Sequence, residues 1–284
     1  MNRRLRCWLA AVAVAAAGLP VRADPQAPRE VQFPSLDGTT LTAWVQLPAQ
    51  RPKATVIALH GCGGLYARRS SDRSQLSARH RAMAELLVGQ GYAVVFPDSL
   101  SPRDQVELCT QPFATRSVGQ MARRADALAA LSWVAAQPWA QPDRIALLGW
   151  SHGGSTVLAA TDLTRTPVRH ARVRPALAVA FYPGCSAALH SGYRPSTTLV
   201  LMLAELDDWT PAKPCIELGH AVGAEVNVYA GSYHAFDNPR GQVRLLPDVP
   251  NGVNPGVGVH AGANPAAREQ AYARLGALLR QAFP

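Results

Sequence analysis

The chain has 284 residues, of which 48% are hydrophobic and 17% are charged, and its formal net charge is +9. This length and apolar content exclude a disordered chain and allow one large domain or two small ones. The basic residues are scattered singly or in pairs without interleaved aromatic side chains, so we expect no nucleic-acid surface.

Residues 1–23 have the pattern of a secretory signal peptide. Arginines at the start precede an alanine-rich apolar stretch at residues 8–19, and Ala23 is a small residue at the expected cleavage point. A stretch of about a dozen residues is shorter than the ~20 that span a bilayer, which favours a cleaved leader over the alternative, an N-terminal membrane anchor. We therefore expect export, to the periplasm or as a secreted protein, without stable membrane insertion after cleavage. The leader holds four arginines and no acid, which leaves the mature chain at +5.

The rest of the chain alternates short apolar runs with segments of helical spacing. Runs typical of strands occupy residues 41–45, 55–59, 93–97, 145–148, 176–182, 199–203 and 226–229. Helical spacing is found at residues 76–88, 118–131, 155–160 and 216–222. Asn264 followed by Pro265 predicts the start of a last helix.

Continuous apolar strands separated by helices predict an α/β fold with a mostly parallel central sheet and helices on both faces. Residues 237–264 are rich in glycine, proline and asparagine, and we expect a surface loop near the site there, not a second domain. Residues 24–284 are therefore expected to form a single domain. The active site of such a sheet is expected at the carboxyl ends of its strands.

The segment Gly149-x-Ser151-x-Gly153 stands between a predicted strand and a predicted helix. In that context it is typical of the nucleophile elbow of the α/β-hydrolase fold, a turn too tight for a β-carbon on either side of the serine. The serine backbone is strained there, at a cost on the order of 1–3 kcal/mol, and its hydroxyl is exposed at a helix N-terminus. We predict that Ser151 is a nucleophile.

A serine nucleophile needs a base and an orienting acid, and this fold supplies them in the chain order serine, acid, histidine. His234 follows the predicted strand at residues 226–229 through a short loop, so it is the expected base. His220 falls in a predicted helix, and His260 falls in the glycine-rich segment with no strand before it.

The acid is expected in the loop after the strand at residues 199–203. Asp207 would hold the Nδ1–H of the histidine and stabilise the imidazolium that forms when the serine loses its proton. Asp208 is the next candidate, and Glu205 is expected to be a strand-end residue with another partner.

An oxyanion hole needs two preorganised backbone N–H groups. In this fold one comes from the residue after the nucleophile, here His152, and the other from the loop after an earlier strand, here Cys62. His60 precedes both the serine and the acid in the chain, so we interpret it as a structural residue that braces this loop.

Four cysteines remain once the leader is removed, and an even number in an oxidising compartment suggests two disulfides. Of the three possible pairings we favour Cys62–Cys109 and Cys185–Cys215, since each would join the ends of neighbouring strand units. The alternative is four buried free thiols. No CxxC pair is present, so we expect no zinc site.

Together these residues resemble the dienelactone hydrolase family within the α/β hydrolases. The matching stretches, in family order, are HGCGG (60–64), GYAVVFPD (91–98), GWSHGG (149–154), LDDWTP (206–211) and YHAF (233–236). In the family the acid stands three residues past a small residue at the strand end, with proline four residues beyond it. Ala204, Asp207 and Pro211 fit, so the resemblance implies Asp207. Dienelactone hydrolases proper are cytosolic and use a cysteine nucleophile, so the resemblance carries over an ester-hydrolase mechanism but not the dienelactone substrate.

We therefore expect a serine hydrolase that cleaves a small-molecule carboxylic ester through an acyl-enzyme and needs no metal or organic cofactor. Trp150, Trp209, Tyr66 and Phe236 are expected to wall the pocket. Arg103 is either a partner for a substrate carboxylate or a surface arginine. Two other functions stay open: a peptidase or amidase of the same fold, and a non-catalytic binding protein that kept the fold.

Overall fold

The centre of the protein is one eight-stranded sheet. The computed structural model describes residues 27–67 and 75–284, so the predicted signal peptide lies outside the described residues. The strands are β1 (Arg29–Pro34), β2 (Thr40–Gln46), β3 (Thr55–Leu59), β4 (Ala93–Asp98), β5 (Ile145–Trp150), β6 (Leu177–Phe181), β7 (Thr198–Ala204) and β8 (Glu225–Tyr229). They lie in the order β1-β2-β4-β3-β5-β6-β7-β8, and every pair from β4 to β8 is parallel. The predicted fold class, a mostly parallel sheet, is confirmed.

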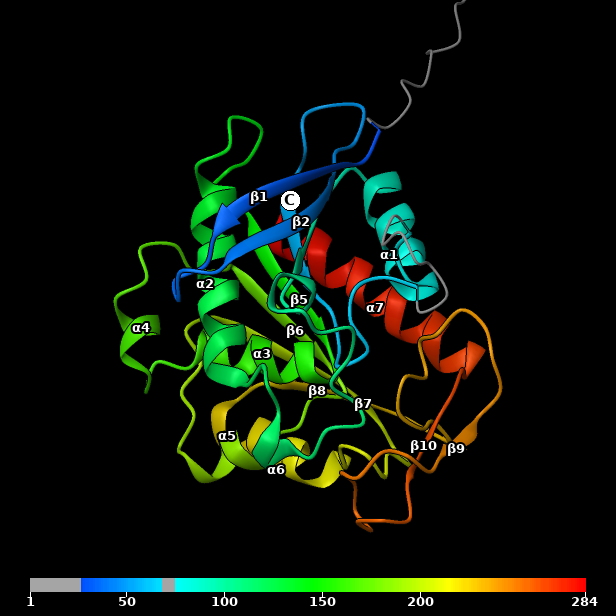
Figure 1. Cartoon of the computed structure of the whole chain (residues 1–284). Helices are drawn as coiled ribbons and strands as arrows, with labels where there is room; N and C mark the ends of the chain where they lie inside the picture. The colour runs from blue at the N-terminus through cyan, green and yellow to red at the C-terminus, as the bar shows by residue number, and fades with distance from the viewer. Residues whose placement is uncertain (1–26, 68–74) are drawn as a thin grey trace, which may run out of the picture.

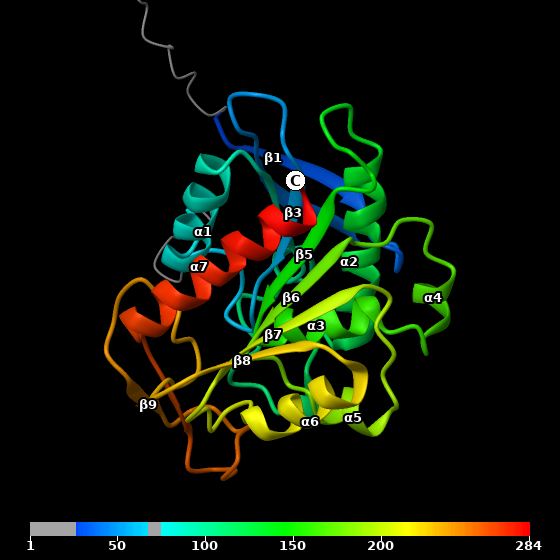
Figure 2. The same ribbon diagram turned by 180° about the vertical axis from the view of Figure 1, so that it is seen from behind.

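Helices cover both faces of this sheet, as Figure 1 and the reverse view in Figure 2 show. One face is covered by α1 (Ala78–Gly89) and α7 (Pro265–Ala282), and the other by α2 (Gln120–Ala135), α3 (His152–Thr161) and α6 (Ala212–Val222). Short helical segments are α4 (Thr166–Arg169), α5 (Ser186–His190) and the 3-10 turns η1 (Ser101–Arg103) and η2 (Phe113–Thr115).

Strand periodicity explains how one sheet supports two cores. Val56 and Ala58 of β3 belong to the core under α1 and α7, whereas Ile57 and Leu59 belong to the core under α2 and α3. Successive side chains of a strand point to opposite faces, so a strand buried on both faces is a continuous apolar run. All five residues of β3 are buried accordingly.

The N-terminal edge of the sheet differs from the sequence-based expectation. β1 was not predicted, and both β1 and β2 run antiparallel to their neighbours. Only one residue of β1, Phe33, is buried, because its other side chains lie at the exposed edge of the sheet. A strand with one buried side chain has too little apolar content to stand out as a pattern.

Residues 237–264 form a long excursion from the sheet after β8. The excursion ends beside residues 234–236, close to where it began. They contain the antiparallel pair β9 (Arg244–Leu246) and β10 (Val259–Ala261). At the return, the Gly262 N–H donates to the His234 carbonyl (3.0 Å) and the Asn264 N–H donates to the Phe236 carbonyl (2.9 Å). The Asn264 side chain then accepts from the Ala267 N–H, which is the predicted cap of α7.

Both predicted disulfides are present. Cys62–Cys109 joins the loop after β3 to the loop that precedes α2, and Cys185–Cys215 joins the start of α5 to α6. Their sequence separations of 47 and 30 residues correspond to roughly 4 kcal/mol of stabilisation each in the chain-entropy account. Within the described ranges, no helix is long and apolar enough to cross a bilayer.

Candidate active site

Ser151 occupies the sharp turn between β5 and α3. Its φ of 54° is in the left-handed region, which a residue with a β-carbon adopts only under strain. A β-carbon at Gly149 would lie 2.3 Å from the Gly153 carbonyl oxygen, and one at Gly153 would lie 2.0 Å from the Leu59 carbonyl oxygen. The two glycines of the motif are therefore required by the close passage of backbone on both sides of the serine.

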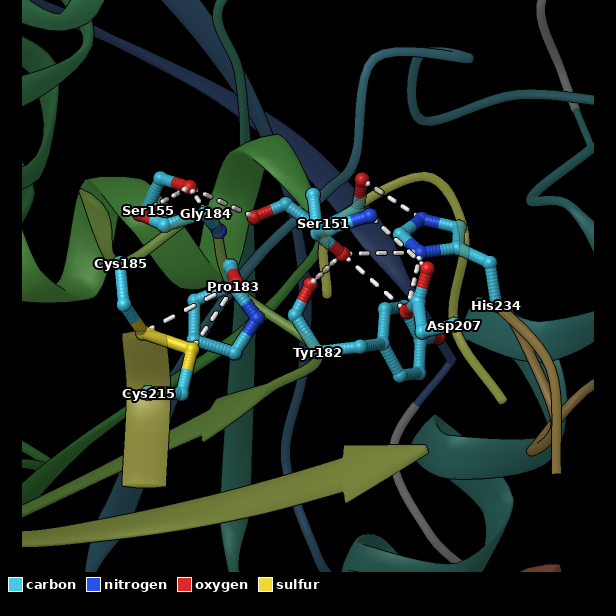
Figure 3. Close-up of a disulfide and its surroundings, with 10 residues drawn as sticks. Ser151, Ser155, Tyr182, Pro183, Gly184, Cys185, Asp207, Cys215 and His234 are labelled. Carbon is cyan, nitrogen blue, oxygen red and sulfur yellow. Dashed lines mark hydrogen bonds and ion pairs between the residues drawn. A yellow bond between two sulfur atoms is a disulfide. The ribbon is translucent and has the colours of Figure 1, made fainter. Parts of the chain in front are cut away.

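Three side chains from the carboxyl ends of three strands form one line of hydrogen bonds (Figure 3). The Nε2 of His234 lies 2.9 Å from the Ser151 Oγ, and its Nδ1 lies 2.8 Å from the Asp207 Oδ2. All three residues are buried. Because an ionised carboxylate only accepts hydrogen bonds, the Nδ1 carries the proton and the Nε2 is free to accept from the serine hydroxyl.

The Asp207 carboxylate is held by its own loop. Its Oδ1 accepts from the N–H groups of Trp209 (2.9 Å) and Thr210 (2.8 Å), and its Oδ2 accepts from the Thr210 hydroxyl (3.1 Å). These donors fix the direction of the carboxylate toward His234. Thr210 also lies 3.1 Å from the His234 Nδ1, a contact that sequence reasoning missed although a hydroxyl three residues after an aspartate is a common turn signal.

The neighbouring candidates have other partners. Asp208 accepts from the backbone N–H of His260 (2.8 Å) and lies 2.7 Å from its Nδ1, so this pair sits beside the line and not in it. Glu205 accepts from the Gly231 N–H (2.8 Å), as expected of a strand-end residue. His220 is exposed on α6.

The imidazole of His234 is packed between two aromatic rings. The ring centroids of Trp209 and Tyr182 each lie 4.6 Å from that of His234. Its backbone is tied to the returning chain at Gly262, and the next residue, Ala235, has a positive φ of 62°. These contacts hold the ring in one orientation against the serine.

A second buried carboxylate, which sequence reasoning missed, links the elbow to the histidine loop. The fully buried Asp237 accepts from the Trp150 Nε1 (2.8 Å), the Tyr182 hydroxyl (2.5 Å) and the Tyr272 hydroxyl (3.1 Å). The Nε of Arg79 lies 3.1 Å away as an ion-pair partner. Trp150 directly precedes Ser151, and Tyr182 contacts the ring of His234. The hydrogen bonds of Asp237 to these two side chains therefore help to position Ser151 and His234.

The loop after β3 passes directly beside Ser151. A β-carbon at Gly61 would lie 3.5 Å from the Ser151 Cβ, which places the following residue, Cys62, at the serine. The Cys62 N–H donates no hydrogen bond to any described residue, and the His152 N–H is in the first turn of α3, where helical amides have no intrahelical acceptor. Both amides predicted for the oxyanion hole thus remain available as donors.

Two buried histidines flank these amides without titrating near neutral pH. His60 lies 2.8 Å from the Gly61 carbonyl through its Nδ1, and its Nε2 accepts from the Ser99 N–H (3.2 Å), so it braces the loop as predicted. Burial, with the nearby Arg123 guanidinium, lowers the pKa of His60 well below its ordinary value. Burial, with Arg123 and Arg116, does the same to the pKa of His152.

Ser151 opens into a cavity of about 750 Å³. Trp209, one of the four aromatic residues predicted to wall the pocket, lines it. The other three were predicted wrongly: Trp150 and Phe236 are fully buried in the core under α1 and α7, and Tyr66 packs against that same core. Trp150 lies on the same face of β5 as the buried Leu148, because side chains two positions apart in a strand point the same way. Its indole therefore points into the core and away from the cavity.

Of the two interpretations left open for Arg103, the contacts of its guanidinium disfavour a partner for a substrate carboxylate. Its guanidinium makes two hydrogen bonds to Asp126 (2.9 and 2.8 Å) and one to Asp37 (2.7 Å). Asp126 in turn accepts from the Ser35 hydroxyl (2.6 Å), so Arg103 fastens the β1–β2 turn to α2. It is absent from the residues that line the cavity.

Within the described part of the chain, no group of three or more histidine, cysteine, aspartate or glutamate side chains could hold a metal ion.

Comparison with known proteins shows that the fold is that of the α/β hydrolases. The sequence model of the dienelactone hydrolase family matches residues 41–283. Similar solved structures include a dienelactone hydrolase-like promiscuous phosphotriesterase from metagenomic libraries, with 18% identity, TM-score 0.64 and coverage of 91% of this chain and 100% of that one. A carboxylesterase from Lactobacillus plantarum has 14% identity, TM-score 0.61 and coverage of 91% and 98%. Dipeptidyl peptidase 4 from Porphyromonas gingivalis has 16% identity, TM-score 0.59 and coverage of 92% and 36%. No curated protein matches the chain.

Proposed function

Because the chain belongs to the dienelactone hydrolase family, we propose that it is a serine hydrolase that cleaves a carboxylic ester through an acyl-enzyme. The observation that carries this proposal is the continuous line from the Ser151 Oγ through His234 to Asp207, with distances of 2.9 and 2.8 Å. A nucleophile, a base and an orienting acid within hydrogen-bond reach are what acyl transfer requires.

In the acylation step, the Ser151 Oγ attacks the ester carbonyl while the His234 Nε2 takes the hydroxyl proton. The tetrahedral oxyanion accepts hydrogen bonds from the amides of Cys62 and His152. Collapse breaks the bond to the alcohol oxygen, which receives its proton from His234. The Asp207 carboxylate stabilises the imidazolium throughout, since its Oδ2 already accepts from the Nδ1.

In the second step, His234 takes a proton from water, and the water oxygen attacks the acyl carbonyl. The same two amides hold the second oxyanion, and collapse returns the proton to the Ser151 Oγ and releases the carboxylic acid. Donors of this kind are each worth on the order of 3 kcal/mol of transition-state stabilisation. Every group in this cycle belongs to the chain, so the proposal needs no cofactor.

We further propose that residues 24–284 act as one exported catalytic domain. The two disulfides support an oxidising compartment, because such bonds persist outside the reducing cytosol. Edman sequencing of protein from the extracytoplasmic fraction tests this, and an N-terminus at Met1 would contradict cleavage after Ala23.

Labelling with a fluorophosphonate probe tests the nucleophile. The wild-type protein is expected to acquire one covalent adduct at Ser151, and the Ser151→Ala variant none. Folded wild-type protein that fails to label would favour the non-catalytic binding protein instead.

A matched pair of aryl acetate and aryl acetamide then separates the esterase from a peptidase or amidase. We expect kcat/KM for the ester to exceed that for the amide by several orders of magnitude. Faster cleavage of the amide would contradict the ester assignment while leaving the nucleophile in place.

A further inference from the structure

The cavity at Ser151 is a groove that follows one side of α3. Ser155, Ala159 and Asp162 line it at helical spacing from the nucleophile. The ten residues of α3 correspond to a length of about 15 Å. A zigzag alkyl chain advances by less than its C–C bond length of about 1.5 Å per bond, so this length accommodates a chain of at least about ten carbons. The groove is therefore much longer than the reacting ester group.

The two walls of the groove come from elements on either side of α3. One wall is α5 with the short segment that follows it, and it presents Ala187, Ala188 and Tyr193. This wall is fixed to α6 by the Cys185–Cys215 disulfide, which Figure 3 shows beside Ser155 and Gly184. The opposite wall is the start of α2 with Gly119 and Met121. Small and apolar side chains thus dominate the middle of the groove.

Large apolar side chains are exposed at the mouth of this groove. Phe113, Met121 and Val253 all line it, and 57%, 77% and 55% of their surfaces are accessible. They come from η2, α2 and the segment after β9, which are far apart in the sequence. Apolar side chains that converge from separate elements around a cavity mark a binding surface more strongly than single exposed residues do.

Two of the three arginines that line the groove have a partner among its lining residues. Arg165 pairs with Asp162 at 3.0 Å at the far end of α3. The Arg116 guanidinium stacks over the Phe113 ring at 4.3 Å, and burial lowers its pKa to about 10. Arg124 is the remaining arginine, near the Asp162 end. The polar groups therefore flank or close a path whose middle is apolar.

We propose that the groove binds an extended apolar chain of the ester, of roughly ten carbons, laid along α3 from Ser151 toward Asp162. This inference rests on the proposed function and names its substrate class. The apolar carbon chain belongs either to the acyl group or to the alcohol of the ester, since both groups are attached to the carbonyl carbon that Ser151 attacks. Burial of each methylene stabilises the bound ester, so even a partly covered chain changes kcat/KM strongly.

Two ester series test this. One is p-nitrophenyl acetate to p-nitrophenyl laurate, and the other is ethyl to decyl acetate. In one of the series, kcat/KM is expected to rise at least tenfold between two and ten carbons and then level off. A flat profile in both series, from protein that labels at Ser151 and cleaves acetate, would contradict the binding of an apolar chain in the groove. It would leave the proposed function standing. Folded protein that neither labels nor cleaves any ester would contradict both the proposed function and the binding of the apolar chain.

Variants locate the chain. Ala159→Phe places a ring between Ser155 and Asp162 in the groove and is expected to lower the ratio of long-ester to acetate kcat/KM at least tenfold. The matched control is Ala273→Phe, an exposed alanine of α7, which is expected to keep the wild-type ratio. An unchanged ratio in Ala159→Phe would overturn the proposal.

A second variant covers the case in which Ala159→Phe does not fold. Met121→Ser changes a side chain that is 77% exposed at the mouth, so folding should tolerate it. We expect the ratio to fall about threefold, from lost contact with the end of the chain. Fluorophosphonate labelling reports whether each variant keeps a reactive Ser151, and a wild-type ratio in Met121→Ser would count against the apolar mouth.

Discussion

Asp207 and Asp208 are adjacent carboxylates with separate tasks. The first accepts from His234 and from two backbone amides of its own turn, and the second accepts from the backbone and side chain of His260. The first is buried and the second half-buried. Chain order alone did not decide which of the two aspartates contacts His234. The backbone amides of Trp209 and Thr210 direct the Asp207 carboxylate toward it.

This difference gives a matched pair of substitutions. Asp207→Asn is expected to lower kcat by roughly three to four orders of magnitude, because an amide favours the wrong tautomer of His234. Asp208→Asn is expected to cost less than tenfold. Ester hydrolysis and thermal unfolding of both variants check this. Equal losses in the two would mean that the orientation of His234 does not depend on Asp207.

At the residue scale, the side chains that meet in the hydrogen-bonded line could be predicted, and most of their surroundings could not. Ser151 and His234 follow from local patterns, a glycine-flanked serine after a strand and a histidine after the last strand. Asp237 could not be predicted, because nothing near it in the sequence shows that Trp150, Tyr182 and Tyr272 converge on it. Such convergence depends on contacts between residues 35 to 87 positions apart.

Among the elements, the loop after β3 depends on a covalent bond for its place at the nucleophile. Cys62 supplies a proposed oxyanion donor, and its sulfur is bonded to Cys109. The Leu108 N–H donates to the Cys62 carbonyl (2.8 Å), and the Glu107 carboxylate accepts from the Cys109 N–H (2.6 Å). The bridge thus joins the donor loop to a segment that is itself held by two further hydrogen bonds.

Removing this bridge should therefore affect catalysis as well as stability. The double variant Cys62→Ser/Cys109→Ser is expected to lower kcat for p-nitrophenyl acetate about tenfold or more, since the donor amide loses its fixed position. Measurements of kcat and of the midpoint of thermal unfolding check this.

The second disulfide provides the comparison for that variant. Cys185→Ser/Cys215→Ser removes a loop closure of similar size and should lower the unfolding midpoint comparably, with a smaller loss of kcat on acetate. If both variants lost kcat in proportion to stability, the Cys62–Cys109 bridge would have no positioning role.

Element prediction succeeded where burial makes a pattern and failed where it does not. The parallel strands β3 to β7 are continuous apolar runs because both of their faces are covered. β9 and β10 have three residues each and are mostly half-buried or exposed, so no periodicity can develop in them. The segment between these two missed strands contributes Gly252 and Val253 to the lining of the cavity.

For the whole molecule, three buried histidines link stability to pH. Burial lowers the pKa of His80 to about 3 and the pKa values of His60 and His152 well below the ordinary value. The unfolded chain takes up protons at these positions near pH 6.5, and the folded protein does not. The free energy of unfolding therefore falls as the pH falls below that value, by up to about 1.4 kcal/mol per pH unit for each histidine.

Urea unfolding at pH 7 and pH 5 tests this linkage. The wild-type protein is expected to lose about 2 kcal/mol per buried histidine over this interval. His80→Gln should reduce the pH dependence by one histidine's share, whereas His220→Gln, at an exposed position, should not change it. An identical pH dependence in all three proteins would contradict the contribution of His80.

The return of residues 237–264 to their starting point has a consequence for how such an enzyme can diversify. The hydrogen bonds from Gly262 to His234 and from Asn264 to Phe236 fasten both ends of the excursion beside the base, while Val253 within it reaches the cavity mouth. Doubling the length of such a loop costs only about 0.6 kcal/mol in closure entropy. Insertions and deletions there can retune substrate preference while the inherited proton-transfer machinery stays in place.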